Sequence, residues 1–403
     1  MGILDEIKEK NTWEKFLEYK KERGLLSKRE IKELTAFIDE DRFIPVAEAM
    51  SGSGYSFPPP RRISINRKGS GKKRTVYSFD SEITNVLKLI AFLLYRYDSY
   101  ISDRCYSFRR NMNAKTAVRD ILSVPKDRRM YFYKTDIHDY FNSIPNERLA
   151  DKLDEVITDD EEILALLRSL LLQERCVENG ETISCRCGAM AGVPVSAFFA
   201  DIYLKRFDEL FSGIGADYFR YSDDILIFAS SEKKLQEYID LTASEIEKYG
   251  LELNREKEQT GGPGEEWEYL GFRSGEGKVR LSSVSKLKIK AKIKRKAHAL
   301  YRWRKRKNVD FEKTAAKMIS IFNRKFYDDR KENGFTWSRW YFPVITDVSD
   351  LKEIDAYLIE NIRYLSSGRY YKGNYRVRYE DIKKLGFRSL VNEYYKYIKS
   401  GEV

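Results

Sequence analysis

Two neighbouring carboxylates, Asp223 and Asp224, lie where one apolar run gives way to another. Residues 217–229 read DYFRYSDDILIFA, with apolar and aromatic residues on both sides of the polar tripeptide that begins at Ser222. This pattern predicts a tight β-hairpin with both aspartates at or beside its turn. Adjacent carboxylates repel each other beside an apolar sheet, and a divalent cation such as Mg²⁺, which prefers oxygen ligands, would relieve that repulsion. For a lone Asp-Asp pair, an ordinary turn is the competing interpretation.

A third carboxylate, Asp136, ends another apolar segment. Residues 130–137 read MYFYKTDI, which predicts a β-strand, and HDYFNSI follows. Asp136 precedes Asp223 by 87 positions (223 − 136), so only the fold could bring the two together. The aromatic residue Phe141 comes five residues after Asp136, and simple core packing is one explanation for it.

Basic residues gather in two places, and both indicate an anionic partner. Residues 61–79 predict a hairpin with a basic tip around a Gly-Ser-Gly turn, where like charges are unfavourable unless an anion binds; a solvated loop is the alternative. Residues 286–307 contain twelve basic residues and no acidic one. Their alanines favour a helix, although Lys-Leu-Lys-Ile-Lys alternates like a strand. One sign of charge over this length predicts a face that binds a polyanion.

The composition as a whole agrees with a nucleic-acid partner. The 403 residues include 74 Lys and Arg against 63 Asp and Glu, which gives a net charge of +11. Aromatic residues make up 14 % of the chain, which suits base stacking as well as core packing. No apolar run approaches the length of a membrane span, and no signal-peptide pattern opens the chain, so we expect a cytoplasmic protein.

The four cysteines are predicted to be reduced. With only two histidines in the chain, a zinc cage is not expected. Cys176, Cys185 and Cys187 lie in a predicted hairpin over 173–188 with Asn-Gly at its turn, where the last two would face one side of a strand. Together with Cys105 they indicate buried structural thiols in a reducing compartment.

Local periodicity predicts the remaining elements. Residues 1–50 contain two or three amphipathic helices, with Ser27 capping the second, and SGSGYSFPPP at 51–60 is a loop. Helices are also expected over 83–97, 151–172 and 235–249, and a strand over 250–259.

The order of the motifs resembles that of bacterial reverse transcriptases over residues 61–305. Tyr221 and the two aspartates that follow Ser222 resemble the Tyr-x-Asp-Asp box of that family. The pattern Asp-x-x-x-Tyr-Phe-x-x-Ile, which begins at Asp136, resembles its first palm motif.

Three further segments carry the same resemblance. CYSFRRNMNAKTAV at 105–118 resembles the Phe-Arg box, and EYLGF at 268–272 resembles the primer grip. The segment that follows Ala191 resembles the next palm motif, in which Ser196 and Asp201 fall on positions that the family usually fills with Ser and Asn. Ala191 itself replaces the usual glutamine, a departure that concerns how the template base is positioned.

The resemblance implies an α+β fold, a right-hand polymerase with fingers and palm plus an α-helical thumb and C-terminal region. The palm is an antiparallel sheet flanked by helices. We expect a helical extension and linker over 1–60, fingers over 61–129, and a palm over 130–275 with fingers elements around 151–190. A basic helical thumb and C-terminal extension would occupy 276–403.

The resemblance also implies which residues act. Two-metal phosphoryl transfer on Mg²⁺, or Mn²⁺, would add deoxynucleotides to a primer, and Phe141 would exclude the 2′-hydroxyl of a ribonucleotide. The implied catalytic residues are Asp136, Asp223, Asp224 and Lys257, the last protonating pyrophosphate; the metal-binding set is Asp136, Ile137, Asp223 and Asp224. The nucleotide-binding set is Lys72, Arg74, Arg109, Tyr140, Phe141, Gly192 and Ser196. The nucleic-acid-binding set is Tyr221, Tyr269, Leu270, Gly271, Lys292, Lys294, Arg295, Lys296 and Arg302.

The expected activity is RNA-directed DNA synthesis from dNTPs on an RNA template. The helical N-terminal extension and the tail RYEDIKKLGFRSLVNEYYKY look most like the defence-associated classes (unknown-group and abortive-infection), which implies antiphage defence with a dedicated non-coding RNA. The group II intron maturases and the retron enzymes are alternative classes within the family. The oligomeric state is left open, and a homo-oligomer is one of the alternatives. The alternatives are a template-independent polymerase of the same fold and an inactive nucleic-acid-binding scaffold. The three intact aspartates argue against the scaffold, and Phe141 argues against an RNA product.

Overall fold

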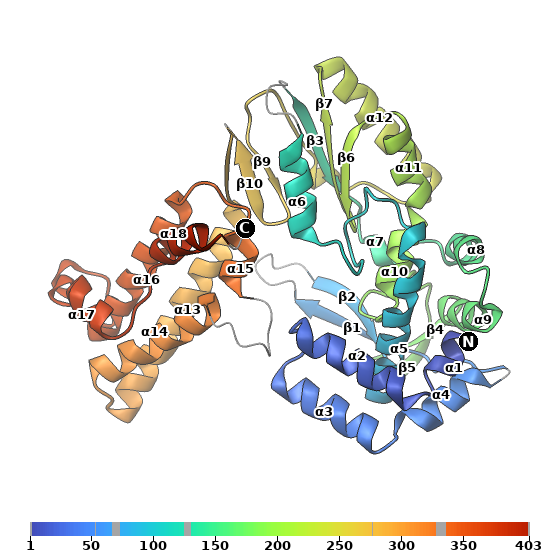
Figure 1. Ribbon diagram of the computed structural model, residues 1–403, viewed down its shortest axis with the longest axis horizontal. Coiled ribbons are helices and arrows are strands. Elements are labelled where there is room, and N and C mark those ends of the chain that lie inside the picture. The colour runs from blue at the N-terminus through green and yellow to red at the C-terminus, as the bar shows by residue number, and fades with distance from the viewer. Residues whose placement is uncertain are drawn as a thin grey trace. The chain divides into compact units, whose positions relative to one another are not determined.

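The computed structural model describes residues 2–52, 54–66, 73–124, 130–275, 277–327 and 336–401. The chain divides into two compact units, one formed by Met1–Glu22 with Leu26–Gly264 and the other by Arg23–Leu25 with Glu265–Val403. The boundary at Gly264 falls inside the segment that the sequence assigns to the palm. Figure 1 labels most of the helices and strands of both units.

The chain opens with four helices, whereas the amphipathic pattern predicts two or three over residues 1–50. They are α1 (Ile3–Glu6), α2 (Lys10–Glu22), α3 (Lys28–Asp39) and α4 (Phe43–Ser51). Trp13 is fully buried among aromatic rings, with the Phe37 and Phe43 centroids 5.4 and 5.3 Å away. The capping box expected at Ser27 is confirmed, because its hydroxyl accepts the Glu30 N–H at 3.3 Å and the Glu30 carboxylate accepts the Ser27 N–H at 2.8 Å.

A four-stranded sheet of order β2-β1-β4-β5 follows in the first unit. Its strands are β1 (Arg61–Asn66), β2 (Lys73–Ser78), β4 (Arg175–Glu178) and β5 (Glu181–Ser184). Both predicted hairpins are therefore confirmed, with β1 antiparallel to β2 and β4 antiparallel to β5. The tip of the first hairpin, including Lys72, lies outside the described residues.

Further helices lie between β2 and β4 in the sequence. They are α5 (Ser81–Leu93), the 3-10 helix η1 (Leu94–Tyr100), α6 (Ala114–Ser123), α8 (Asn146–Val156) and α9 (Glu161–Leu171). The helical structure predicted over 151–172 is confirmed, but it is divided between α8 and α9. The chain leaves α8 after Val156, and Asp160 begins a new helix because its carboxylate accepts the Ile163 N–H at 3.1 Å.

The second sheet of this unit has the order β6-β7-β3-β8. Its strands are β3 (Tyr131–Asp136), β6 (Asp217–Tyr221), β7 (Asp224–Ala229) and β8 (Gln259–Gly261), and every pairing is antiparallel. Helix α12 (Glu232–Lys248) packs against β3 and β7, as Figure 1 shows. The other helices of this region are α7 (Tyr140–Ser143), α10 (Ser196–Tyr203) and α11 (Lys205–Gly213).

The strand predicted over 250–259 was largely wrong. Leu253 makes a single bridge with Ile137, the 3-10 turn η2 (Arg255–Lys257) follows, and the regular strand is β8. The polar segment pairs instead with the end of β3 and the residues just after it, and the Asn254 N–H donates to the Asp136 carbonyl at 2.8 Å. This turn is what brings Lys257 to Asp136.

The second unit holds a three-stranded sheet of order β11-β10-β9 and a set of helices. Its elements are β9 (Trp267–Tyr269), β10 (Phe272–Gly275), β11 (Lys278–Leu281), α13 (Ser283–Lys307), α14 (Phe311–Tyr327), α15 (Trp337–Tyr341), α16 (Ser349–Ser367), η4 (Lys372–Arg376), α17 (Tyr379–Lys384) and α18 (Leu390–Ser400). The helix predicted over the basic stretch is confirmed by α13. It buries one stripe of side chains: Ile289, Ile293, Ala297 and Leu300.

Among the helices of the described residues, none is long and apolar enough to cross a membrane.

Candidate active site

Three carboxylates meet at one end of the β6-β7-β3-β8 sheet. The hairpin prediction is confirmed, because β6 ends at Tyr221, β7 begins at Asp224, and the turn residue Ser222 has φ of 59°. Antiparallel pairing of β3 with β7 sets Asp136 opposite Asp224. The Ile137 N–H donates to the Asp223 carbonyl at 3.2 Å and extends this pairing past the strand end. Register therefore joins residues that are far apart in the sequence.

Two of these carboxylates have raised pKa values, because they are buried close to other negative charges. Burial, together with the charges of Asp223 and Asp136, raises the pKa of Asp224 to about 7. Burial also raises the pKa of Asp223, with the Asp136 charge adding to the effect. Clustered acids whose ionised forms are mutually unfavourable indicate a place for a cation.

The ammonium of Lys257 supplies part of that charge, since it pairs with Oδ2 of Asp136. The side chain of Asp136 is only 7 % exposed, whereas that of Lys257 is 42 % exposed. The described residues include no set of three aspartates whose ligand oxygens all lie within 4.8 Å of one another. The ammonium of Lys257 thus occupies one oxygen of Asp136, a carboxylate that is a candidate metal ligand.

The donor set nevertheless fits a hard divalent cation. Oδ1 of Asp136 is buried and has no hydrogen-bond partner among the described residues. A buried carboxylate oxygen left unpaired is costly, and a divalent ion with oxygen ligands would satisfy it. Asp223 and Asp224 offer further oxygens at the same end of the sheet, where Lys134 also lowers the pKa of Asp224 by its charge.

An aromatic group adjoins the carboxylates. Phe141 lies in α7 and is half-buried, with the Phe108 centroid 6.1 Å from its own. The ring of Phe108 also lies 6.2 Å from that of Tyr221. The guanidinium of Arg74, on β2, lies 5.8 Å from the Phe141 ring centroid. This arrangement combines a flat apolar surface with a cation, which suits a nucleoside bearing phosphates.

Gly192 has a structural reason to be glycine. Its φ is +102°, and a Cβ there would come within 2.9 Å of the Tyr77 carbonyl oxygen on β2. The Tyr77 N–H also donates to the Ala191 carbonyl at 2.7 Å. The close approach of this loop to β2 therefore requires a residue without a side chain.

Three other predicted nucleotide-binding residues make contacts within the protein. Tyr140 is buried, and its hydroxyl donates to the Ala200 carbonyl at 2.5 Å. Ser196 is buried, and its hydroxyl donates to the Met190 carbonyl at 2.7 Å. The Arg109 guanidinium is only 10 % exposed and donates to backbone carbonyls, so phosphate binding would require it to leave them.

A buried ion pair supports the turn that carries Asp223. Arg220 and Asp208 are both fully buried, and Nε and Nη2 of Arg220 donate to the two Asp208 oxygens at 2.7 and 2.6 Å. The Tyr218 hydroxyl also donates to Asp208 at 2.7 Å. Nη1 of Arg220 donates to the Ser222 carbonyl at 3.1 Å, which ties the turn to the ion pair.

The same turn is held from the other side. The Ser222 N–H donates to the Ser107 hydroxyl at 2.9 Å, and that hydroxyl donates to Asp201 at 2.6 Å. Burial raises the pKa of Asp201 to about 7, against the charge of Arg220, which lowers it. The Cys105 thiol also donates to Asp201 at 3.3 Å. Together these groups fix the backbone on which Asp223 is placed.

Sequence reasoning missed Arg220, Asp208 and Phe108 as contributors to this site. Arg220 had a detectable signal, because a charged residue inside an otherwise apolar strand requires a buried partner. Asp208 had none, since it lies on an amphipathic helix where acids are common. Phe108 lies in the predicted Phe-Arg box and is 40 % exposed, which is unusual for a ring.

The second unit carries the predicted primer grip and the basic helix. β9 and β10 are joined by a turn in which Leu270 and Gly271 have φ of 50° and 92°. Tyr269 is buried. The five basic residues predicted on α13 are all exposed: Lys292, Lys294, Arg295, Lys296 and Arg302.

The sequence had indicated a basic stretch without compensating acidic charge. In the structure, however, part of this stretch is paired with acidic residues. Lys286 donates to Asp350 at 2.9 Å, and both Lys286 and Lys290 pair with Glu353. Burial lowers the pKa of Lys325 on α14, and the neighbouring charge of Lys292 lowers it further. Two lysines in the first part of α13, Lys286 and Lys290, are therefore paired with acidic residues of α16.

The sheet with its terminal carboxylates and flanking helices is the palm of a right-hand polymerase fold, and the chain is a mixture of helices and antiparallel sheets as predicted. Residues 65–274, just over half of the chain, match the family described as reverse transcriptase (RNA-dependent DNA polymerase). The chain therefore belongs to the reverse transcriptase family, whose members generally use divalent metal ions. No curated protein matches the chain.

Solved telomerase structures are similar to the chain at low sequence identity. Apo telomerase from Candida tropicalis, truncated from its C-terminal domain, is 15 % identical with a TM-score of 0.44 over 56 % of this chain and 55 % of that one. The same enzyme with a TWJ fragment of telomeric RNA is 14 % identical, with a TM-score of 0.47 over 86 % and 65 %. Candida albicans telomerase with the same kind of fragment is 12 % identical, with a TM-score of 0.45 over 88 % and 66 %. The chain thus spans between about half and two thirds of these relatives.

Proposed function

We propose that this chain is an RNA-directed DNA polymerase that extends a primer with deoxynucleotides. The observation that carries the proposal is the strand register that sets Asp136 opposite Asp224, beside Asp223. Three carboxylates at a strand end, one with an unpaired buried oxygen, form a site for divalent cations in a member of the reverse transcriptase family.

The residues of the chain would divide the work as follows. Asp136, Asp223 and Asp224 would hold Mg²⁺ or Mn²⁺, which lowers the pKa of the primer hydroxyl and stabilises charge on the phosphates. Lys257 would leave Asp136 when a cation binds and would then be free to give a proton to the departing pyrophosphate. Its partly exposed side chain lets the ammonium move between these positions.

The fingers and the aromatic group would orient the nucleotide. Arg74 lies over the ring of Phe141, so a triphosphate bound by that guanidinium would place its sugar against the same ring. A bulky group under the sugar excludes a 2′-hydroxyl by contact, and the product would therefore be DNA. Catalysis on such a site consists mainly of positioning and charge stabilisation.

Primer extension tests the proposal. Wild type should extend a DNA primer on an RNA template with dNTPs and Mg²⁺, and the variant Asp223→Asn with Asp224→Asn should not. Neutral amides remove the ligand charge but also the repulsion, so the variant should keep its fold and its affinity for template–primer. Asp217→Asn, at the far end of β6, is the matched control and should retain activity.

The outcomes separate the alternatives. Extension by the double variant at the wild-type rate would refute the assignment of the site. Extension of a primer without any template would show an untemplated polymerase on the same fold. Binding without extension by wild type, with either metal ion, would show an inactive scaffold.

We further propose that the enzyme is a bacterial, defence-associated member that copies a dedicated non-coding RNA. The support is the sequence resemblance of the N-terminal extension and the tail, together with the exposed basic face of α13. Sequencing RNA that co-purifies from the native host tests this proposal. One dominant RNA species is expected, and a random sample of transcripts would contradict it.

A further inference from the structure

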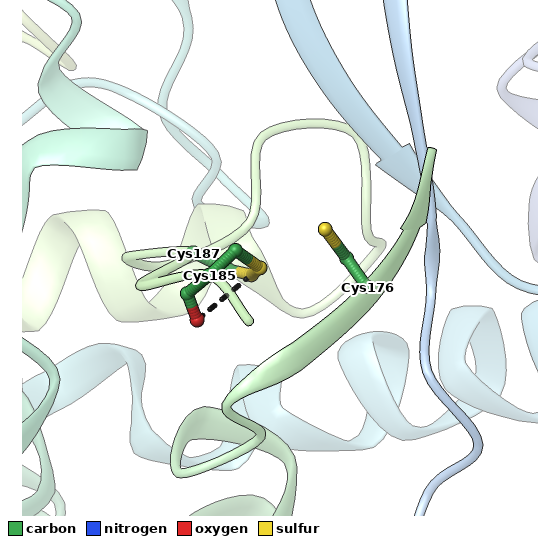
Figure 2. A group of neighbouring side chains, drawn as sticks. All are labelled: Cys176, Cys185 and Cys187. Carbon is green, nitrogen blue, oxygen red and sulfur yellow. Dashed lines mark hydrogen bonds between the residues drawn. A yellow bond between two sulfur atoms is a disulfide. The ribbon is translucent and has the colours of Figure 1, made fainter. Parts of the chain in front are cut away.

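Three cysteine side chains converge at one point of the first unit. Cys176 lies on β4, while Cys185 and Cys187 follow β5, and the three Sγ atoms all lie within 4.8 Å of one another. Figure 2 shows the Cys176 sulfur pointing toward the other two. The expectation that the last two cysteines lie on a strand was wrong, because β5 ends at Ser184. The Cys185 N–H donates to the Glu174 carbonyl at 2.8 Å and holds this segment against the hairpin.

The sequence had predicted reduced structural thiols here, but Cys185 and Cys187 are joined by a disulfide. Cys176 is free and buried beside them. Ordinary packing does not require three sulfurs in one place, and the described part of the chain contains no other such group of His, Cys, Asp or Glu ligands. The convergence therefore indicates a shared ligand or a shared redox reaction.

We propose that Cys176, Cys185 and Cys187, once reduced, form a binding site for a thiophilic divalent cation of the zinc type. Thiolates are soft ligands that select such ions. With zinc–sulfur bonds of about 2.3 Å, tetrahedral geometry sets the sulfurs about 3.8 Å apart, so only small movements separate the three side chains from a ligating arrangement. The fourth position is open to solvent or to an exogenous ligand, because Cys185 is only half-buried.

Burial and the charge of Glu178 oppose ionisation of Cys176, and one neighbouring cation counters them. Three thiolates and a divalent ion carry one net negative charge, and Arg62 on β1 is the neighbouring cation. Burial raises the pKa of Cys176, and the Arg62 charge opposes that effect. Nε of Arg62 is buried without a hydrogen-bond partner among the described residues, although its Nη1 pairs with Glu178 at 3.2 Å.

The chemistry balances with a thiol as the reductant. Two molecules of an external thiol reduce the Cys185–Cys187 disulfide to two thiols and are themselves oxidised to one disulfide. The divalent ion then displaces the three thiol protons and binds the three sulfurs. The oxidised chain has lost two of the three ligands, so the redox state controls occupancy of the site.

The site adjoins the segment that holds Phe141. Just after Cys187, the Ala189 N–H donates to the Phe141 carbonyl at 2.7 Å. At Gly188, with φ of +57°, a Cβ would come within 2.5 Å of the same carbonyl oxygen. An ion that ties this loop to β4 would thus stiffen the backbone behind the predicted sugar-contacting ring; this consequence rests on the proposed function, whereas metal binding does not.

Cobalt titration of the whole chain tests the proposal. After reduction with a phosphine and anaerobic desalting, Co²⁺ should give a thiolate-to-cobalt charge-transfer band that saturates at about one ion per chain, and Zn²⁺ should abolish it. Cys176→Ser and Cys185→Ser should each lose the band. Cys105→Ala, a change at the free cysteine outside the group, is the matched control and should keep it.

Two further measurements keep the test decisive if a variant misfolds. In wild type, Zn²⁺ should protect three of the four reduced thiols from alkylation, as mass spectrometry of the modified cysteines would show. The chain with its disulfide intact should show no cobalt band. Absence of the band in reduced wild type, or an equal band in the oxidised chain, would overturn the proposal whether or not the chain polymerises DNA.

Discussion

Removing Asp208 should strongly destabilise the folded chain, because it leaves a guanidinium buried without its counter-charge. Arg220 and Asp208 are both 0 % exposed and share two hydrogen bonds, and the Tyr218 hydroxyl makes a third to the same carboxylate. Breaking a buried pair by removing one partner costs about 3–5 kcal/mol. Since domains are stable by only about 5–15 kcal/mol, Asp208→Ala should lose a large share of the free energy of unfolding.

Urea denaturation followed by circular dichroism measures this loss. The matched control is Asp154→Ala on α8, whose carboxylate pairs with Arg168 at 2.5 Å with both side chains more than one third exposed. An exposed pair of this kind contributes about 0–1 kcal/mol. Asp208→Ala should therefore lower the denaturation midpoint several times more than Asp154→Ala does.

A double variant separates stability from positioning. Asp208→Ala with Arg220→Met removes both buried charges, so it should be more stable than Asp208→Ala alone. It also removes the hydrogen bond from Arg220 to the Ser222 carbonyl, so the turn before Asp223 should be less well fixed and kcat should fall even though the chain folds. Equal midpoints for Asp208→Ala and Asp154→Ala, or a double variant less stable than the single one, would refute the reasoning.

Three other predictions follow from the structure. Relative to wild type, Asp201→Asn should be increasingly more stable as the pH rises from about 4 to 7. The reason is that Asp201 has a pKa of about 7 in the folded chain against an ordinary value of 3.8, so its ionisation makes folding of the wild type less favourable over this range. Thermal melts of both proteins across this range would check the prediction, and a difference in stability that is the same at all pH values would contradict it. Phe141→Ala should lower the ratio of kcat/KM for dNTP over rNTP. An unchanged ratio with activity retained would show that Phe141 serves only in core packing. Neutralising four exposed basic residues of α13 should reduce the slope of log affinity for template–primer against log salt concentration by up to about 0.9 per lost contact. Lys290→Gln, at a lysine already paired with Glu353, is the control and should leave this slope unchanged. Equal slopes for wild type and the four-residue variant would show that the duplex does not bind at α13. The four changes are Lys292→Gln, Lys294→Gln, Arg295→Gln and Lys296→Gln.

Where short-range rules decide the structure, the sequence was sufficient. The hairpin of β6 and β7 follows from the apolar runs on both sides of a polar tripeptide. The hairpin of β4 and β5 follows from Asn-Gly at its turn. The helix over the basic stretch follows from the helix preference of its alanines. Its start is also local, since the Ser282 hydroxyl accepts the Ser285 N–H at 3.1 Å.

The local rules failed where a segment had competing partners. Residues 250–259 read as a strand, but the backbone groups of Glu252 and Asn254 pair with the end of β3 and the residues just after it, and a turn follows at Lys257. The predicted helix over 151–172 breaks because the Asp160 carboxylate caps a new helix and also accepts the Ile3 N–H at 2.7 Å. The contacts with β3 and with Ile3 are too distant in the sequence for a local window, whereas the cap of Asp160 on Ile163 is a local signal that the periodicity does not reveal.

The sequence by itself determined the order of the motifs, the three aspartates and the surplus of positive charge, because these depend on residue type and spacing alone. Only the tertiary structure decided that Asp136 lies opposite Asp224, that Arg220 finds Asp208, and that three sulfurs converge. The physical reason is that strand register, burial and the pairing of buried charges are settled by contacts between segments distant in the chain, whose cost and gain appear only when the whole core forms.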